Sequence, residues 1–404
     1  MKFHRNYPLL LGSQFLSAFG DNVILAVILG QLTFLHQQQE ITGSDLRTYN
    51  ALYTSVLFIP YILLAPLAGY VNDRFPKTRW LLGGNAIKLT GTLIAALSVW
   101  WGYAWQAAGY FMVGVGACLY SPAKYGILPE ILPKERLVKA NGTVELLTLI
   151  AILTGPLSGA IMVDRLPVLW CYIIILAIFA ASLGLNLFMA QTPFNPAIRL
   201  SASVKEFSDN FRILINSRRL IRIILGTGVF WVSGAVLKMN FQPWGLEVLG
   251  FTNNTQIAKL GLWLGLGIMA GSVLAGQLHK VGDLKANRFY GLALAFLVAL
   301  LSLFSYLGVV VPLLILIGAS AGLFLIPLNA ALQSESHQDK LGKTIATQNF
   351  IDNVGMIFGG AYVVIGIKAG LNPLGIFVGL AVMIALAMLW LKIPARKEEQ
   401  HDQN

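Results

Sequence analysis

The sequence predicts an all-α membrane protein in which twelve transmembrane helices form two six-helix halves related by pseudo-two-fold symmetry. Three observations predict this fold: the composition, the spacing of the apolar runs, and a likeness between the two halves of the chain. Hydrophobic residues make up 56% of the 404 residues and charged residues only 12%, about half the charged share of a typical soluble domain. This composition excludes a soluble enzyme, a secreted disulfide-rich domain and a disordered regulatory protein.

Apolar runs long enough to cross a bilayer, which takes about 20 residues, follow one another along the whole chain. The first is longer than the apolar core of a signal peptide, so we expect it to remain as an uncleaved span. Six runs precede the longest polar stretch, at residues 7–35, 48–71, 79–101, 105–128, 137–163 and 167–190. Six more follow it, at residues 222–248, 256–278, 286–307, 309–333, 341–368 and 372–393.

The longest polar stretch divides the chain. We expect an N-terminal six-helix half at residues 1–191, a cytoplasmic linker at 192–219, a C-terminal six-helix half at 220–393 and a cytoplasmic tail at 394–404. Similar motifs recur in the two halves: SPAKYGILPE in the fourth run and IPLNAALQSE in the tenth align Glu130 with Glu335 at an offset of 205 residues. Such a repeat is typical of transporters whose substrate site lies between the halves near the midplane.

The positive charges predict the orientation of the chain in the membrane. With both termini in the cytoplasm, cytoplasmic segments and the adjoining run ends hold 22 of the 29 lysines and arginines, and the opposite side holds four. The remaining three, Lys88, Lys124 and Lys238, are counted as lying within the spans. This asymmetry follows the positive-inside rule. The net charge of +11 is therefore mostly an insertion signal, and we expect no nucleic-acid partner.

Residue types that carry catalysis or bind metals show no functional spacing. The two cysteines lie inside apolar runs, and no two of the five histidines share the spacing of metal ligands, so we expect no metal and no cofactor. The sequence contains no phosphate-binding loop and no grouping of serine, histidine and acid that could meet in space. We therefore expect neither ATP hydrolysis nor another enzymatic activity.

An ionisable side chain inside a span is costly and is a functional candidate for that reason. Asp21 lies 14 residues after Tyr7 and Lys238 lies 16 residues after Arg222, about 21 and 24 Å along their helices at 1.5 Å per residue. The first and seventh spans are equivalent in the repeat, so this acid and base would face one another at similar depth. They could pair in the empty state or bind the two ends of a zwitterion; alternatively, they only lock the halves together.

Other polar groups inside the spans are further candidates for a substrate-binding site. Lys88 lies about 13 Å into the third span and requires a partner or a cavity, whereas Lys124 either contributes to the site or extends to the cytoplasmic interface. Asn22 adjoins Asp21 and is assigned to the same site. Residues that could form a polar lining, or alternatively hydrogen bonds between helices, are Asn141, Glu145, Gln348, Asn349, Asp352 and Asn353.

The turn between the second and third spans, GYVNDRFPKTR at residues 69–79, resembles the loop signature of the major facilitator superfamily. That signature has a glycine, an acid four residues later and a basic cluster, here Gly69, Asp73, Arg74, Lys77 and Arg79. Asp73 can cap a helix terminus or meet basic groups, so we expect these residues to form a conformational latch on the cytoplasmic face. In the second half, Lys280 stands at the position that corresponds to Asp73, so the second copy of the motif lacks the acid.

Beyond the superfamily, several tracts resemble the bacterial lysophospholipid transporter family (LplT). The matching tracts are QFLSAFGDN at 14–22, SPAKYGIL at 121–128, LVKANG at 137–142, FLIPLNA at 324–330 and ATQN at 346–349. They occur in matching order and spacing from the first span to the eleventh, and SPAKYGIL is the most specific. The resemblance therefore covers nearly the whole chain, with the linker and the outer loops diverging.

The resemblance implies a secondary transporter that moves lysophospholipids, such as lysophosphatidylethanolamine, from the outer to the inner leaflet of the bacterial inner membrane by alternating access. Reacylation would then need a separate acyltransferase, and we expect the transporter itself to be a monomer. The family's acid and base map to Asp21 and Lys238, and its fourth-span lysine maps to Lys124. The seventh-span base is typically arginine in the family, and lysine lacks the bidentate geometry of arginine toward phosphate.

A proton-coupled exporter of amphiphilic drugs is the alternative function. Gly155, Pro156 and Gly159 in the fifth span resemble part of a Gly-Pro motif in proton antiporters of the same superfamily, although a kink with close helix packing explains these residues equally well. A membrane receptor or scaffold without transport activity is a third class. Uptake of a labelled lysolipid against efflux of a dye separates the three functions.

Overall fold

The computed structural model describes residues 5–133, 136–193, 196–197, 199–280, 282–336 and 341–394, apart from the side chains of residues 66, 69, 73, 137–139, 142, 145, 202–203 and 341–343. Every regular element in this part of the chain is a helix, as the sequence predicts. The chain forms two compact units. Unit 1 comprises Met1–Glu206, Lys238–Leu262 and Ile357–Pro373, and unit 2 comprises Phe207–Leu237, Trp263–Met356 and Leu374–Asn404.

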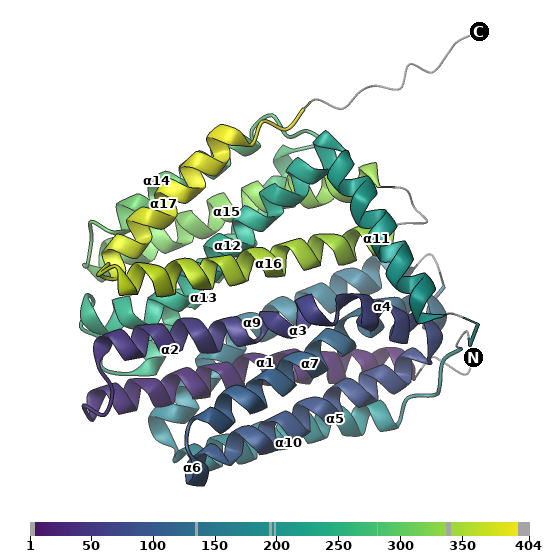
Figure 1. The fold of residues 1–404 in the computed structure, drawn as a ribbon, viewed down its shortest axis with the longest axis horizontal. Helices are drawn as coiled ribbons and strands as arrows, with labels where there is room; N and C mark the ends of the chain where they lie inside the picture. Colours follow the sequence, from purple (N-terminus) through teal and green to yellow (C-terminus); the bar gives the residue numbers. More distant parts are fainter. Residues whose placement is uncertain are drawn as a thin grey trace. The chain divides into compact units, whose positions relative to one another are not determined.

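Unit 1 is built on five long helices (Figure 1). They are α1 (Asn6–Gln37), α5 (Lys77–Ala96), α7 (Ala104–Gly126), α9 (Leu137–Arg165) and α10 (Val168–Leu187). Helix α1 packs along α9 and α10, while α5 packs along α7 and α10. Two short helices, α6 (Ser98–Trp101) and α8 (Leu128–Ile131), extend α5 and α7. A helix satisfies its own backbone hydrogen bonds, which is the condition for crossing hydrocarbon.

The second predicted span is divided into three helices, α2 (Gly43–Val56), α3 (Phe58–Leu63) and α4 (Ala65–Arg74). Helix α2 begins with a capping box in which Thr42 Oγ1 accepts a hydrogen bond from the Asp45 backbone N–H at 3.1 Å. The two later pieces each carry a proline near their first turn, Pro60 and Pro66. Proline has no N–H to donate, so it interrupts a helix unless it stands near the start.

Unit 2 contains α14 (Asn287–Leu301), α15 (Leu307–Glu335) and nearly all of α17 (Pro373–Trp390). The remaining helices contribute residues to both units: α11 (Leu200–Asn216), α12 (Arg218–Glu247), α13 (Asn254–Leu278) and α16 (Leu341–Lys368). The division into halves at residues 1–191 and 220–393 stays a prediction.

Helix α11 occupies most of the predicted linker, where the sequence analysis placed no element. Its Phe207 and Phe211 rings pack edge-on against Phe350 of α16, at centroid distances of 6.0 and 6.1 Å. Asn210 Nδ2 also donates to Thr347 Oγ1 at 3.3 Å. The four-residue spacing of the two phenylalanines places both rings on one face of the helix. A segment that is polar on average can therefore still pack against α16.

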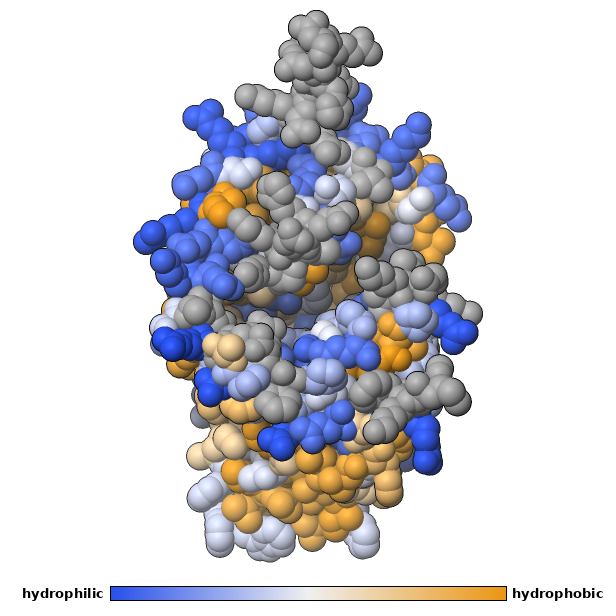
Figure 2. Space-filling model, turned by 90° about the vertical axis from the view of Figure 1, so that its right-hand side faces the viewer, coloured by the Kyte–Doolittle hydropathy of each residue, from blue (hydrophilic) through white to orange (hydrophobic). Residues whose placement is uncertain are grey.

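Nine helices of the described chain are long and apolar enough to cross a bilayer. The helix α14 is apolar but shorter, α7 is not among the nine, and the segment from α2 to α4 is broken. The protein is therefore a multi-pass membrane protein, and the count of twelve spans stays a prediction. Figure 2 shows one end of the helices, where hydrophilic residues gather.

Glycines allow the closest helix contacts of unit 1. A Cβ at Gly155 of α9 would lie 2.7 Å from Asn22 Cβ of α1, and a Cβ at Gly159 would lie 2.7 Å from Val23 O. Real Cβ atoms do not approach so closely, so only glycine permits this contact between α1 and α9. Close packing, one of the two interpretations of the Gly-Pro motif, is thus confirmed.

Candidate substrate-binding site

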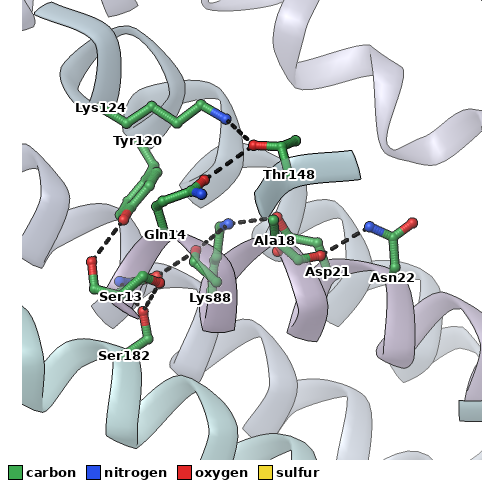
Figure 3. A network of polar contacts seen from close by, with 12 residues as sticks. Ser13, Gln14, Ala18, Asp21, Asn22, Lys88, Tyr120, Lys124, Thr148 and Ser182 are labelled. Atoms are coloured by element: carbon green, nitrogen blue, oxygen red, sulfur yellow. Dashed lines mark hydrogen bonds and ion pairs between the residues drawn. The ribbon is translucent and has the colours of Figure 1, made fainter. Parts of the chain in front are cut away.

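Inside unit 1, a buried ion pair joins Asp21 of α1 to Lys88 of α5 (Figure 3). Asp21 Oδ2 lies 2.6 Å from Lys88 Nζ, which also donates to Ser17 Oγ at 2.8 Å. Lys88 is 2% exposed and the side chain of Asp21 is 17% exposed. A buried ammonium group needs a charged partner to offset its desolvation. The structure thus supplies the partner that Lys88 was expected to require.

The pair has one unused oxygen. Asp21 Oδ1 is buried and has no hydrogen-bond partner among the described residues. A carboxylate oxygen in an apolar setting is a strong acceptor, and leaving it unpaired is costly. A donor group that reached Asp21 Oδ1 would therefore meet an acceptor that Lys88 does not occupy.

Aromatic rings and a glycine hold Lys88 in place. Its Nζ lies 5.2 Å from the ring centre of Tyr120 and 5.9 Å from that of Phe179, where the negative ring faces attract a cation. A Cβ at Gly116 would lie 2.7 Å from Lys88 Cγ and 2.5 Å from the carbonyl oxygen of Gly84. Helices α5 and α7 can therefore approach, and the lysine stem can pass between them, because position 116 has no side chain.

A chain of neutral polar side chains continues from the pair toward α10. Ser17 Oγ donates to Asn85 Oδ1 at 2.7 Å, and Asn85 Nδ2 donates to Ser182 Oγ at 2.7 Å. The hydroxyls of Ser13 and Tyr120 lie 2.9 Å apart, and the amide of Asn186 lies between Ser13 and Asn85. Side chains in this chain are almost wholly buried. A buried network of this kind fixes the orientation of the ion pair.

Lys124 of α7 lies buried beside this network instead of extending to the interface. The residue is 9% exposed, its Nζ lies 3.4 Å from Thr148 Oγ1, and it stands 4.7 Å from the ring centre of Tyr125. Thr148 in turn lies 3.2 Å from Gln14 Oε1 (Figure 3). The interpretation of Lys124 as a surface-seeking lysine is therefore wrong.

The pairing of Asp21 with Lys238, one of the alternatives that the sequence left open, does not occur in the structure, because Asp21 is paired with Lys88. The side chain of Lys238 is exposed, and it makes no ion pair with a described residue. The side chain of Lys238 is therefore accessible to an anionic group.

The candidates in α16 lie in unit 2. Asp352 is 3% exposed, and its Oδ1 lies 3.0 Å from Thr227 Oγ1 of α12. Gln348 Nε2 donates to Asn329 Oδ1 at 2.9 Å, and Asn353 Nδ2 donates to the carbonyl oxygen of Asn349 at 2.7 Å. Asn349 itself is exposed. These contacts are hydrogen bonds between and along helices, the alternative that the sequence left open for this group.

The other predicted lining residues lie along α1 and α9. Asn22 Nδ2 donates to the carbonyl oxygen of Ala18 one turn earlier, at 2.9 Å, and its Cβ faces Gly155. Asn141 is exposed, and the side chain of Glu145 lies outside the described part of the chain. Asn22 thus contributes to the contact of α1 with α9.

Part of the predicted latch is described. Lys77 Nζ lies 2.5 Å from Glu130 Oε1, Arg74 stacks between the rings of Tyr70 and Phe75, and Arg79 is exposed. Gly69 and Asp73 fall on positions of α4 outside the described side chains. Glu335, the repeat counterpart of Glu130, also forms an ion pair, with Arg219 at 2.7 Å. Both repeat-equivalent acids are thus paired with a base.

A second polar cluster, missed by the sequence analysis, lies in unit 1. Asp164 at the end of α9 accepts hydrogen bonds from the backbone N–H groups of Asn254 and Thr255, the first residues of α13, at 3.0 and 2.7 Å. Thr33 of α1 donates to Asn254 Oδ1 at 2.6 Å, and Gln242 of α12 donates to Thr33 Oγ1 at 2.6 Å. We call these five residues the polar clasp. It ties α1 and α9 to α12 and α13.

The sequence carried a signal for the missed members of the ion-pair network. Ser13, Ser17 and Asp21 follow one another at intervals of four residues on α1, and Ser182 and Asn186 share that interval on α10. Residues four apart lie on one helical face. A polar stripe of this period inside an apolar run therefore predicts a shared buried network.

Comparison with known proteins identifies the class of this chain. Residues 10–360 match the family model of the Major Facilitator Superfamily, so the chain belongs to that superfamily of membrane transporters. A solved D-xylose-proton symporter has the same fold, with a TM-score of 0.76 over 98% of both chains at 14% identity. The human organic anion transporter MFSD10 (TETRAN) gives 0.70 at 15% identity, over 97% of this chain and 100% of that one.

Relatives of higher identity narrow the class to one family. The lysophospholipid transporter LplT of Enterobacter sp. (strain 638) is 34% identical over 386 residues, which cover 94% of both chains. LplT of Photorhabdus laumondii is 33% identical over 401 residues, or 96% of this chain and 95% of that one. Within the superfamily, the chain belongs to the LplT family.

Proposed function

We propose that this protein transports lysophospholipids across the bacterial inner membrane. One observation in the structure carries the proposal: the Asp21–Lys88 pair is buried among helices, yet Asp21 Oδ1 has no hydrogen-bond partner in the part of the chain that the structure describes. A lysophospholipid such as lysophosphatidylethanolamine carries an ammonium group and a phosphate. Asp21 suits the ammonium group, and the exposed cation of Lys238 suits the phosphate.

The charges select the headgroup, while the apolar surroundings bind the chain. Burial of a hydrocarbon contributes about 0.8 kcal/mol per CH₂, so one acyl chain supplies ample affinity without polar contacts. Lys238 binds phosphate as a point charge and not as the bidentate fork of arginine. Headgroup preference is therefore the property in which this protein should differ from relatives that carry arginine at that position.

We further propose the direction and setting of transport. The basic residues in the predicted cytoplasmic loops favour cytoplasmic termini, and lysolipid moves from the outer to the inner leaflet by alternating access, as a monomer. A separate acyltransferase then restores the second acyl chain. The latch at Arg74, Lys77 and Arg79 would stabilise one of the two conformations, with Gly69 and Asp73 as its other members.

The test is uptake of labelled lysophosphatidylethanolamine by spheroplasts that lack their own lysolipid transporters, with dye efflux measured in the same cells. We expect lysolipid uptake with the wild-type protein, strongly reduced uptake with Lys238→Ala, and unchanged uptake with Lys368→Ala, a matched control at an exposed lysine at the end of α16. Dye efflux driven by a pH gradient, without lysolipid uptake, would replace this proposal with a drug exporter. Neither activity would point to a receptor or scaffold.

A further inference from the structure

A cavity in unit 2 lies where α14 begins and α17 ends, and its polar lining is mostly positive. The cavity has a volume of about 180 Å³ and is lined by the segment that leads into α14, the first turn of α14, α15, and the end of α17 with the residues after it. Apolar side chains form most of the wall, and the polar residues that line it are Lys285, Asn287, Arg288 and Lys392. Neither the proposed substrate site nor the latch includes any of these residues.

The three cations at the cavity lack an acidic partner among the described residues. Lys285, Arg288 and Lys392 are exposed, and none of them forms an ion pair within the described part of the chain. Asp283 does not line the cavity; its carboxylate accepts a hydrogen bond from the backbone N–H of Lys285 at 3.2 Å and lies 3.8 Å from His279. Uncompensated cations around a cleft with apolar walls attract an anion.

Asn287 adds a polar atom that is still without a partner. The residue is 3% exposed, and its Nδ2 donates to the carbonyl oxygen of Phe324 at 2.7 Å. Because a carbonyl oxygen only accepts, this contact fixes which end of the amide is nitrogen. The other end, Asn287 Oδ1, is buried and has no hydrogen-bond partner among the described residues, and leaving such an acceptor unpaired is costly. A ligand that fits the cavity therefore carries a negative charge and a hydrogen-bond donor together.

The backbone on two sides of the cavity is anchored to the start of α12. Arg222 donates to the carbonyl oxygen of Lys392. Arg219 donates to the carbonyl oxygen of Pro394 and, at 3.4 Å, to that of Gly282. The residues after α17 and the segment that leads into α14 are thus held by the same helix. A ligand then meets cations whose backbone positions are already fixed, which lowers the cost of binding.

Exposed apolar residues place the cavity at the level of lipid headgroups. Phe289 and Trp390, each next in sequence to a lining residue, are 70% and 64% exposed, and a tryptophan at the end of a span is typical of the boundary between hydrocarbon and headgroups. Phe296 and Leu386, further along α14 and α17, are also exposed. The cavity is smaller than the roughly 300–1,000 Å³ of pockets for drug-sized ligands. It therefore admits a headgroup, while acyl chains pack on the outer faces of these helices.

We propose that this cavity binds the headgroup of an anionic phospholipid of the phosphatidylglycerol type. Basic pockets at the ends of membrane helices suit such headgroups. The phosphate lies between Arg288 and Lys392, and a headgroup hydroxyl donates to Asn287 Oδ1. The ammonium group of phosphatidylethanolamine would meet three cations and no acid, so that lipid is disfavoured. The lipid comes from the leaflet at this end of the helices, the cytoplasmic one in the predicted orientation. The site does not rest on the proposed function: Asp21 and Lys238 belong to unit 1.

Binding is tested on the purified full-length protein by native mass spectrometry, with phosphatidylglycerol and phosphatidylethanolamine of identical acyl chains. The wild type should bind phosphatidylglycerol more tightly, and Arg288→Ala/Lys392→Ala should weaken that binding roughly thirtyfold, because each cation near an anionic headgroup contributes about fivefold. The matched control is Lys259→Ala/Lys368→Ala, which removes two exposed lysines of α13 and α16 and should bind as the wild type does. Equal binding by the wild type and Arg288→Ala/Lys392→Ala, at unchanged thermal stability, overturns the proposal.

The hydroxyl contact is tested by changing the lipid. Phosphatidylmethanol has the charge of phosphatidylglycerol but no hydroxyl, so the wild type should bind it about fivefold more weakly, the contribution of one hydrogen bond. Asn287→Ala should give the two lipids equal affinity. Equal affinity already in the wild type overturns the role of Asn287 as the acceptor of the headgroup.

Two further measurements identify the occupant and the place. Glycerol 1-phosphate, the headgroup without acyl chains, should displace phosphatidylglycerol only weakly, and displacement as effective as that by the lipid itself would make the cavity a solute site. Lys238→Ala should leave phosphatidylglycerol binding unchanged, and its loss in that variant would assign the lipid to the substrate site and overturn the proposal. Since no transport is measured, either failure leaves the proposed function intact.

Discussion

The Asp21–Lys88 pair allows its role in transport to be separated from its role in folding. The single change Asp21→Asn leaves the Lys88 ammonium group, which is 2% exposed, with Ser17 and two aromatic rings as its remaining contacts. Removing one partner of a buried pair costs about 3–5 kcal/mol. Because the Asp21 side chain is 17% exposed, we expect a cost of about 3 kcal/mol, at the lower end of that range.

The double variant Asp21→Asn/Lys88→Met replaces both charges with neutral groups of similar volume. Such replacements of a buried pair are often close to neutral, so we expect the double variant to lie within about 1 kcal/mol of the wild type, far from the sum of the single changes. Unfolding free energies measured by denaturant titration in detergent test this coupling, with Ser17→Ala as a control that removes the hydrogen bonds to Lys88 and Asn85 and costs about 1–3 kcal/mol. Additive costs in the double variant would refute the assignment of a buried, mutually dependent pair.

Transport by the same double variant decides between a binding site and a structural lock. If Asp21 accepts the substrate ammonium group, the double variant should be stable and should take up labelled lysophosphatidylethanolamine at a small fraction of the wild-type rate. If the pair only holds the helices together, a stable double variant should transport normally. Normal uptake would therefore remove Asp21 from the substrate site.

Three further changes test neighbouring parts of the argument. Gly116→Ala should displace Lys88 and destabilise the protein by about 1–3 kcal/mol through overpacking, measured by the same titration. Lys238→Arg should retain lysolipid uptake and tighten headgroup selectivity through bidentate phosphate contacts, which competition by different lysolipids measures. Asp164→Ala removes the acceptor of the first N–H groups of α13, at a cost of about 0.5–2 kcal/mol. The substitution Thr33→Cys at a buried position then serves as a probe, and its thiol should react with a thiol reagent faster when Asp164→Ala is also present. An unchanged reaction rate would contradict the polar clasp.

Much of the fold was predictable from the sequence because the bilayer imposes length and polarity together. The first predicted run, residues 7–35, is α1 at Asn6–Gln37, and the run 309–333 is α15 at Leu307–Glu335. Errors occurred where average polarity hides local pattern. Helix α11 lies in a stretch that is polar overall, but its phenylalanines share one face. The run 48–71 is apolar on average, yet its prolines break it.

The candidate site was predictable in its residue types and not in its pairing. Depth along a helix singled out Asp21, Lys88 and Lys238, because a charge within a span is costly. Depth does not fix rotation about the helix axis, and the equivalence of the first and seventh spans in the repeat suggested Lys238 as the partner of Asp21. In the structure, Lys88 Nζ of α5 lies 2.6 Å from Asp21 Oδ2 instead. Ser13, Ser17 and Asp21 lie four residues apart and mark the polar face of α1. They therefore indicate how α1 is rotated about its own axis.

The charges within the spans occupy three different physical states, and each state suits a different task. The Asp21–Lys88 pair is buried, so each charge offsets the desolvation of the other, and the pair can exchange contacts with a zwitterionic headgroup. Lys238 is exposed, so its side chain is accessible to an anion. Asp352 is buried in unit 2, where its Oδ1 lies 3.0 Å from Thr227 Oγ1 of α12. Headgroup recognition therefore falls on Asp21 and Lys238, whereas Asp352 contributes a hydrogen bond between helices α12 and α16.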